Sequence, residues 1–480
     1  MTLLLTLAVL GVTPGPGWSE PFVATEEPNS GFKKQFIARD SQGRFHLLWE
    51  DYKDNARIGY KVFLMDGTTV VPDTMVSRDT SSGFLYDPPH YSDSLFAFWR
   101  EYNPVYYCIR SLEDGSEITP ATYLFTEYTD YHRIRACPDS LGRLHTIRNI
   151  GQDVYYAAWI PKEGGGFEEE YGWFIPDAWV SAVLLVDGDR VHVVYQTYQD
   201  ATPHYLQYDL AGNLTVLPYD FTADEFETYR FPELAVDCNR DLIVVTKVHR
   251  IDETPFYAFW KLDGASGSLL VDEKCLVESN IPEMDISSHM DMAPYPGNEM
   301  FYHVWKDGWG SSKKLWYIFF DNEGDMIVEP TMAYDYTDED PEDLRLPNCE
   351  VDDEGNLYVI YGQGEEEPIF GCYPTFGWFD HNYLGIEGDP EAELPPPISL
   401  AASCNPFSES VTIHVEGSPV PGLLEVYDVS GRKIASLEAG EHGAFTWDGT
   451  DSSGEELPAG SYIVRGASEG RLASISVVKL

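Results

Sequence analysis

The chain has 480 residues, and its 80 acidic residues against 31 basic ones give a formal net charge of −49 at pH 7. This charge repels nucleic-acid phosphates and anionic headgroups, so we expect no nucleic-acid partner. Aromatic residues make up 14% of the chain, unlike an acidic disordered protein, so the charge must decorate the surface of a packed fold.

The first segment, residues 1–19, has the pattern of a signal peptide. An apolar run of ten residues, Leu3 to Val12, precedes a Pro- and Gly-containing stretch that ends near the small residue Ser19. The run is too short to span a bilayer, and no other stretch is apolar enough, so we expect no transmembrane segment. The sequence thus predicts an extracellular or outer-surface protein. No Lys or Arg precedes the run and no Ala-x-Ala site follows it, so a misplaced start or the absence of a signal peptide stays an alternative.

Residues 20–385 contain seven repeats, each with a first strand, a tight turn and an apolar second strand that ends at what we call the anchor residue. The anchors are Trp49, Trp99, Arg148, Tyr195, Thr246, Trp305 and Tyr361. A period near 50 residues that is rich in strands and turns is typical of β-propeller blades. Two more strands follow each anchor, which makes four antiparallel strands per period. The sequence therefore predicts an all-β fold built on a seven-bladed β-propeller.

The seventh repeat fades after Trp378 into an acidic, Pro-rich linker, residues 386–396. It therefore lacks an outer strand. We expect the segment from Pro21 to Glu27 to supply that strand, because this closes the ring and covers an exposed sheet edge.

The repeats, for example LLVDGDRVHVVY at residues 184–195, resemble the sialidase-like, BNR-type propellers of secreted bacterial proteins. The resemblance implies a secreted bacterial propeller. The Asp-box of sialidases, Ser-x-Asp-x-Gly-x-Thr-Trp, does not occur intact in the chain, so sialidase chemistry is not implied.

Residues 397–480 form a second region of short alternating strands, which predicts an Ig-like β-sandwich. Its motif residues are Asn405, Pro406, Phe407, Gly431, Arg432, Trp447, Asp448, Gly449, Gly460, Tyr462 and Lys479. With these motifs the region resembles the type IX secretion (Por) sorting domains and the related FlgD-like Ig domains. The resemblance implies an outer-membrane secretion machinery as a partner, with the domain either removed or used as an anchor.

The residues at and just after the anchors should lie on the propeller face that usually carries the ligand. The candidates are Trp49, Glu50, Asp51, Trp99, Arg100, Glu101, Arg148, Tyr195, Gln196, Lys247, Arg250, Trp305, Lys306, Asp307 and Tyr361. Basic side chains beside aromatic rings would suit a carboxylated or sulfated sugar, by stacking and by bidentate pairing. The alternative interpretation is that these charges solvate loop ends and pair with acidic residues of the next blade.

His46, His145 and His192 occupy equivalent positions in three blades, which favours a structural hydrogen bond to a neighbouring blade's backbone over a metal site.

The acidic loop that contains Asp335, Asp338 and Asp340 is a weak calcium candidate, with a solvated loop as the alternative. We expect no other cofactor. Of the seven cysteines, Cys238 with Cys275 and Cys349 with Cys372 are plausible disulfide pairs.

Three functions fit this sequence, one of which is a purely structural role in a surface layer. The first is a non-catalytic propeller that binds an extracellular glycan or protein. The alternative is a carbohydrate-active enzyme, a glycoside hydrolase or lyase, that acts on an anionic polysaccharide. An enzyme of this kind needs two or more carboxyl groups, or a Tyr with a carboxyl group, near the propeller's central mouth beside the Arg residues.

Overall fold

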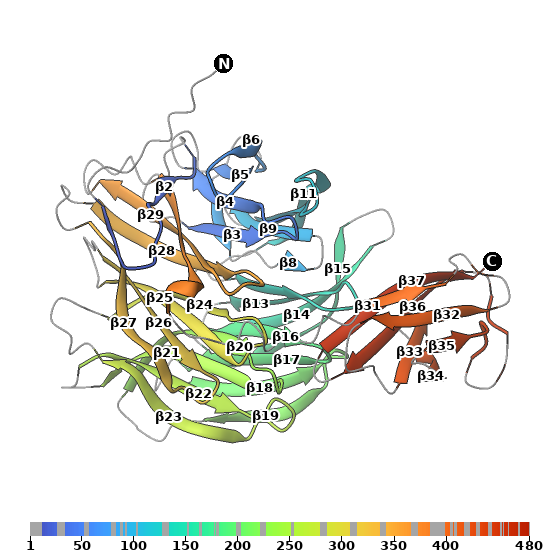
Figure 1. Ribbon diagram of the computed structural model, residues 1–480. Helices are drawn as coiled ribbons and strands as arrows, with labels where there is room; N and C mark the ends of the chain where they lie inside the picture. Colours follow the sequence, from blue (N-terminus) through green and yellow to red (C-terminus); the bar gives the residue numbers. More distant parts are fainter. Residues whose placement is uncertain are drawn as a thin grey trace, which may run out of the picture. The chain divides into compact units, whose positions relative to one another are not determined.

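The computed structural model in Figure 1 describes two compact units, residues 1–384 and 385–480. The described residues run from 12 to 479. They exclude 26–33, 52–56, 78–82, 87–89, 92–93, 102–103, 127–133, 151–152, 163–165, 177, 179–181, 198–202, 221–226, 251–253, 279–285, 308–313, 337–341, 366–372, 385–398, 404–406, 408–409, 417–422, 429–432, 440–443, 452–453, 455, 459 and 469–470.

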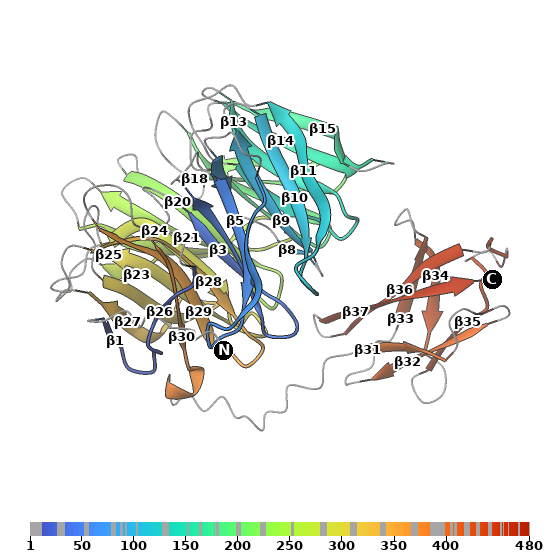
Figure 2. The same cartoon turned by 90° about the horizontal axis from the view of Figure 1, so that it is seen from above.

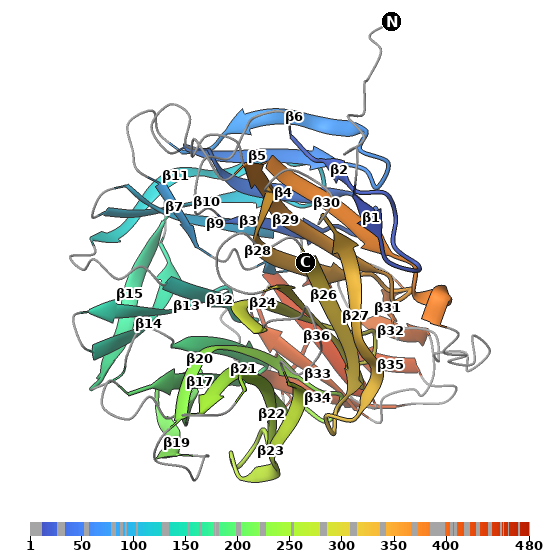
Figure 3. The same cartoon turned by 90° about the vertical axis from the view of Figure 1, so that its left-hand side faces the viewer.

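The first unit is a seven-bladed β-propeller, as predicted, and Figure 3 shows its blades around a common axis. The innermost strands are β3 (Gln35–Arg39), β7 (Gly83–Tyr86) with β8 (His90–Tyr91), β12 (Ile134–Pro138), β16 (Val183–Asp187), β20 (Glu227–Val236), β24 (Ile286–Pro294) and β28 (Glu342–Val351). The second strands are β4 (Phe45–Asp51), β9 (Ser94–Glu101), β13 (Leu144–Ile150), β17 (Arg190–Gln196), β21 (Leu242–Arg250), β25 (Met300–Asp307) and β29 (Leu357–Glu365).

The outer half of each blade is a further antiparallel pair. The third strands are β5 (Arg57–Phe63), β10 (Pro104–Ser111), β14 (Asp153–Pro161), β18 (Pro203–Asp209), β22 (Phe256–Leu262), β26 (Lys314–Asp321) and β30 (Tyr373–Phe379). In the first six blades the fourth strands are β6 (Thr69–Met75), β11 (Glu117–Thr126), β15 (Phe167–Ile175), β19 (Leu214–Asp220), β23 (Leu269–Glu278) and β27 (Met326–Asp335). A short 3₁₀ helix, η1 (His381–Leu384), follows β30.

The N-terminal segment completes the ring. Strand β2 (Phe22–Val23) pairs with β30 and is the outer strand of blade 7, which confirms that residues near Pro21 supply it. Strand β1 (Thr13–Pro14) pairs with β27 as a fifth strand of blade 6. The structure therefore packs residues that the sequence assigned to a signal peptide against the propeller.

The blade cores explain the continuous apolar runs of the second and third strands. Every described residue of β22 is buried, because a blade sandwiched between two neighbours is covered on both faces. The fourth strands lie at the rim and are largely exposed, as in β19. Successive innermost strands pack against each other around the axis, for example β24 against β28 and β28 against β3.

The histidines in the second strands are structural, as expected, and the contacts of their ring nitrogens with other side chains lie within the same blade. His46 Nδ1 lies 2.7 Å from the Tyr60 hydroxyl, and its Nε2 lies 3.2 Å from Asp40 Oδ2. In blade 3, His145 lies 2.8 Å from Tyr156 and 3.1 Å from Asp139 in the same way. Each histidine thus ties a turn aspartate to the third strand.

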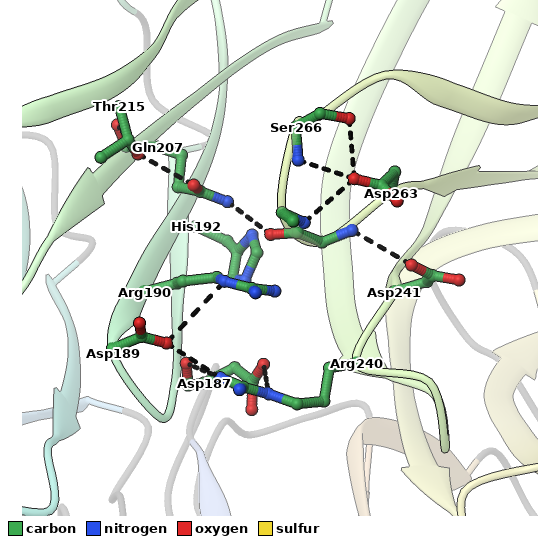
Figure 4. A network of polar contacts seen from close by, with 12 residues as sticks. Asp187, Asp189, Arg190, His192, Gln207, Thr215, Arg240, Asp241, Asp263 and Ser266 are labelled. Carbon is green, nitrogen blue, oxygen red and sulfur yellow. Dashed lines mark hydrogen bonds and ion pairs between the residues drawn. The ribbon is translucent and has the colours of Figure 1, made fainter.

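Blade 4 uses its turn aspartate differently, as Figure 4 shows. His192 Nδ1 still lies 2.8 Å from Tyr205, but Asp187 Oδ2 accepts a 2.8 Å bond from Arg240 Nε of blade 5. His192 Nε2 has no hydrogen-bond partner among the described residues. The Asp187 carboxylate therefore connects blades 4 and 5 through Arg240, whereas the corresponding aspartates of blades 1 and 3 bond the histidine of their own blade.

The second unit is an Ig-like sandwich of two sheets, whose strands are labelled in Figure 2. One sheet contains β31 (Ser399–Ala402), β32 (Val411–Glu416) and β35 (Ala444–Trp447). The other contains β34 (Lys433–Glu438), β33 (Leu423–Asp428), β36 (Gly460–Ser468) and β37 (Arg471–Lys479). Apolar residues of both sheets meet in one core around Trp447.

The described part of the chain holds no helix that is both long and apolar enough to cross a membrane. The expected disulfide between Cys238 and Cys275 does not form, because Cys238 carries a free thiol. Cys349 is also a free, buried thiol, and Cys372 lies outside the described residues.

His303 of β25 is fully buried, and neither ring nitrogen has a hydrogen-bond partner among the described residues. Its ring lies edge-on to Tyr257, with 4.6 Å between centroids. Burial lowers the pKa of His303 to about 3, because a charged imidazolium would have to be desolvated.

We expect His303→Phe to weaken the loss of stability in acid. The unfolded chain protonates this histidine below pH 6.5, whereas the folded chain does so only near pH 3. Its contribution to stability is therefore complete above pH 6.5 and falls by about 1.4 kcal/mol per pH unit down to pH 3. Denaturant unfolding at several pH values measures the slope. Replacing the exposed His249 serves as the control, and an unchanged slope in His303→Phe would contradict the prediction.

Candidate functional site

The anchor rings lie in the blade cores. Trp49, Trp99, Trp305 and Tyr361 are fully buried, and Tyr195 is 5% exposed. Their size and their place between two blades account for this burial. They therefore do not present ring faces on which a sugar could stack.

The Arg148 guanidinium packs over two aromatic side chains and does not point into a circle of basic side chains on a ligand-binding face. Its guanidinium carbon lies 3.7 Å from the centroid of Phe125 and 5.1 Å from that of Tyr155. This cation–π contact, within blade 3 and to the fourth strand of blade 2, stabilises the strand ends.

The polar residues that follow the anchors are buried as well. Those that share this burial are Glu50, Arg100, Glu101, Gln196, Lys247 and Lys306. A carboxylate oxygen of Glu50 accepts a hydrogen bond from the backbone N–H of Leu85 in the next blade, and Trp99 Nε1 donates to Glu101 across 3.0 Å. Both carboxylates therefore accept hydrogen bonds from neutral N–H groups, Glu50 from the next blade and Glu101 from its own strand.

The remaining candidates are only partly described. Asp307 is half-buried at the end of β25, and Asp335 is half-buried in β27 opposite Thr13. The side chains of Asp51 and Arg250, and all of Asp338 and Asp340, lie outside the described residues. Within the described ranges, no three His, Cys, Asp or Glu side chains come together as a metal site.

The innermost strands bring together four polar residues that the sequence interpretation did not select, and we call them the axial cluster. They are Arg135 of β12, Glu233 of β20, Asp291 of β24 and Asn348 of β28. They come from blades 3, 5, 6 and 7, so the cluster reaches across the propeller axis.

Two sets of contacts hold the axial cluster. Arg135 Nη2 donates to Glu233 Oε1 across 3.2 Å and so connects blades 3 and 5. Asn348 Nδ2 donates to Asp291 Oδ2 across 2.8 Å, and the backbone N–H of Cys349 donates to the same oxygen across 2.7 Å. Asn348 Oδ1 accepts a 2.9 Å bond from the backbone N–H of Ile37 in blade 1.

The cluster residues occupy one level of the propeller. Glu233 faces Val245, Asp291 faces Val304 and Asn348 faces Ile360 across their ladders, each one residue before the anchor. Arg135 faces Ile147, the same position in blade 3.

Register shifts precede three of these residues directly. They fall between Arg230 and Glu233, between Ile286 and Met290, and between Arg345 and Asn348. Such irregularities turn side chains out of the regular pleat and are frequent beside functional sites.

Asp291 is the group in this cluster whose protonation is most clearly altered. Burial raises its pKa to about 7, and the negative charge of Glu233 adds to that rise, against the hydrogen bond from Cys349 and the charge of Arg135. Near neutral pH the Asp291 carboxyl can therefore either donate or accept a proton. The Arg135 and Glu233 side chains remain 24% and 17% exposed, so solvent reaches the cluster.

A sequence signal for the axial cluster exists but is weak. Each of its residues lies thirteen or fourteen positions before the anchor of its repeat, within the first strand. Since the register shifts change the pairing, their common level becomes visible only in the structure.

The described motif residues of the C-terminal unit maintain its fold. Phe407, Trp447, Tyr462 and Lys479 are buried. Tyr462 donates to Pro458 O across 2.6 Å, and Lys479 Nζ to Leu457 O across 2.7 Å.

Three further motif residues surround this core. Gly449 has a φ of +76°, a backbone conformation in which any residue with a side chain would be strained. The Asp448 carboxylate bonds Thr450, and Gly460 begins β36. Asn405, Pro406, Gly431 and Arg432 lie outside the described residues.

Comparison with known proteins identifies one family within the C-terminal unit. Residues 408–469 match the FlgD Ig-like domain. A search of the curated proteins returned no match.

Solved structures are similar to this chain at low identity. An ulvan lyase of a polysaccharide lyase family has a TM-score of 0.46 at 9% identity, over 76% of this chain and 95% of that one. The WD40 domain of Toxoplasma gondii coronin has 0.46 at 15%, over 77% and 87%. A leech intramolecular trans-sialidase has 0.42 at 13%, over 78% and 71%. At these identities the activities of those proteins say nothing about the activity of this chain.

We expect Asp291→Asn to change the pH dependence of stability in the direction opposite to His303→Phe. The folded chain keeps the Asp291 proton up to about pH 7, whereas the unfolded chain loses it near pH 4. The stability that comes from protonated Asp291 is therefore present below pH 4 and is lost as the pH rises to 7. The difference in unfolding free energy between the parent protein and Asp291→Asn should follow this course. The exposed Asp353, changed to Asn, is the control, and a pH-independent difference would refute the assignment.

Proposed function

We propose that the protein is an exported propeller that binds an extracellular glycan through the axial cluster without catalysing a reaction. The observation that carries this proposal is the placing of Arg135, Glu233, Asp291 and Asn348 at one level across the axis, with solvent access. Planar carboxyl, amide and guanidinium groups supply the paired donors and acceptors that neighbouring sugar hydroxyls require.

The charge of the chain favours a neutral, hydroxyl-rich glycan. Two carboxyl groups belong to the cluster, while the lysines that follow the anchors, Lys247 and Lys306, are buried. A net charge of −49 also repels an anionic polysaccharide at longer range. A protein ligand is the second kind of partner for the same face.

The destination of the protein belongs to this proposal as well. The apolar N-terminal run, the BNR-like repeats and the type IX sorting motifs all support an extracellular or outer-surface location. The match to the FlgD Ig-like domain supports the kind of fold that a sorting domain of this type would have. The secretion machinery of the outer membrane would be its partner.

One observation favours a carbohydrate-active enzyme as the second candidate. Asp291 carries a proton close to neutral pH and interacts electrostatically with Glu233. A protonated carboxyl beside a second carboxyl group is the pair that glycoside hydrolysis uses as acid and base or nucleophile.

A glycan array that is probed with the full chain tests the binding proposal. We expect neutral glycans to bind and acidic ones not to. Glu233→Gln and Asn348→Ala should weaken binding at least about tenfold, because each removes polar partners of the ligand or of the cluster. Asp353→Asn is the matched control. Binding that is confined to acidic glycans, or that is unchanged in both cluster variants, would overturn the proposal.

Incubation of a bound oligosaccharide with the protein separates binding from catalysis. Products that form with the parent protein and disappear with Asp291→Asn, while binding persists, would establish the enzyme. An intact oligosaccharide after prolonged incubation supports the non-catalytic proposal.

A further inference from the structure

We propose that residues 13–25 are a closing strap of the mature propeller, and that any leader is cut off before Thr13 and not after Ser19. The position of the cut rests on the proposed export, whereas the structural role of the strap does not.

The strap begins on blade 6. Thr13 pairs with Asp335 and Pro14 with Tyr334, and the backbone N–H of Gly15 donates to Ala333 O across 2.8 Å. A Cβ at Gly15 would come within 1.9 Å of Met332 O, so the backbones approach too closely for any other residue. These pairings cover the outer edge of β27, which would otherwise be exposed.

Trp18 then packs between blades 6 and 7. Its indole is 7% exposed, and its ring centroid lies 5.4 Å from Tyr317, 5.1 Å from Tyr334 and 5.4 Å from Phe379. The preceding Gly17 has a φ of +81°, which a residue with a side chain rarely adopts. The glycines at 15 and 17 therefore make the tight turn that carries the indole into this site.

The strap continues along blade 7. The backbone N–H of Ser19 donates to Trp378 O across 2.9 Å, and the N–H of Trp378 donates back to Ser19 Oγ across 3.1 Å. The Tyr334 hydroxyl of blade 6 donates to Ser19 O across 3.1 Å. Ser19 is thus bonded to two blades, which is unexpected for a residue at a cleavage point.

The last part of the strap reaches blade 1. The ring of Phe22 lies 5.2 Å from Phe376 of blade 7 and 5.9 Å from Phe63 of blade 1. The Thr25 hydroxyl donates to Asp73 on the outer strand of blade 1. The strap therefore contacts both blade 7 and blade 1 at the boundary between the last and first blades.

A cut after Ser19 would keep β2 but remove Trp18 and all the contacts to β27. The apolar run from Leu3 ends at Val12, directly before the first paired residue. A cut before Thr13 would remove that run and leave the strap complete.

Chains that are shortened only at the N-terminus test the structural role of the strap, and this test does not require export. We expect a chain that starts at Thr13, after an initiator Met, to melt like the parent protein. A chain that starts at Glu20, and Trp18→Ala in the longer chain, should each melt at least about 5 °C lower. Trp173→Ala is the control, because this indole is 47% exposed at the rim. Equal melting temperatures for the two truncated chains, or for Trp18→Ala and the parent, would refute the strap.

Mass analysis of the N-terminus of the exported protein tests the cut. An N-terminus at or before Thr13 is the expected result, and one at Glu20 would overturn the proposal. A protein that is not exported at all would contradict the proposed function, and the melting experiments would still decide whether the strap is structural.

Discussion

The packing of one blade against the next is the constraint on which the whole propeller depends. A single blade cannot bury both of its apolar faces, so each needs a neighbour on either side, and the last blade needs the first. In this chain the N-terminal segment packs on blades 6, 7 and 1. Trp18 packs against aromatic side chains of blades 6 and 7, and Phe22 packs against aromatic side chains of blades 7 and 1.

This packing also determines which groups a ligand can reach. Because the blade faces are covered, the anchor rings and the charged residues beside them are buried, although their sequence pattern resembles a cationic, aromatic binding surface. Polar groups remain accessible where the innermost strands depart from regular pairing. The register shifts in β20, β24 and β28 place Glu233, Asp291 and Asn348 there, at the cost of desolvating Asp291, whereas Arg135 lies in the regularly paired strand β12.

The propeller and the sandwich could be predicted because their signals repeat. A period near 50 residues, the strand patterns within it and the missing outer strand of the seventh repeat predicted seven blades closed by the segment near Phe22, and the structure agrees. The axial cluster could not be predicted in the same way. Arg135, Glu233, Asp291 and Asn348 lie in four different repeats, and their similar distance from the anchors does not distinguish them from the other polar residues of the first strands.

The fold class, the number of blades and the Ig-like sandwich followed from the sequence alone, because these depend on local periodicity and strand patterning. Tertiary structure alone decided which polar residues meet, which aromatic rings are buried and that residues 13–19 pack on the propeller. The physical reason is that these outcomes depend on contacts between segments hundreds of residues apart, such as Trp18 with Phe379. The local preferences of a segment do not specify such contacts, because these contacts form only when distant segments come together in the closed ring.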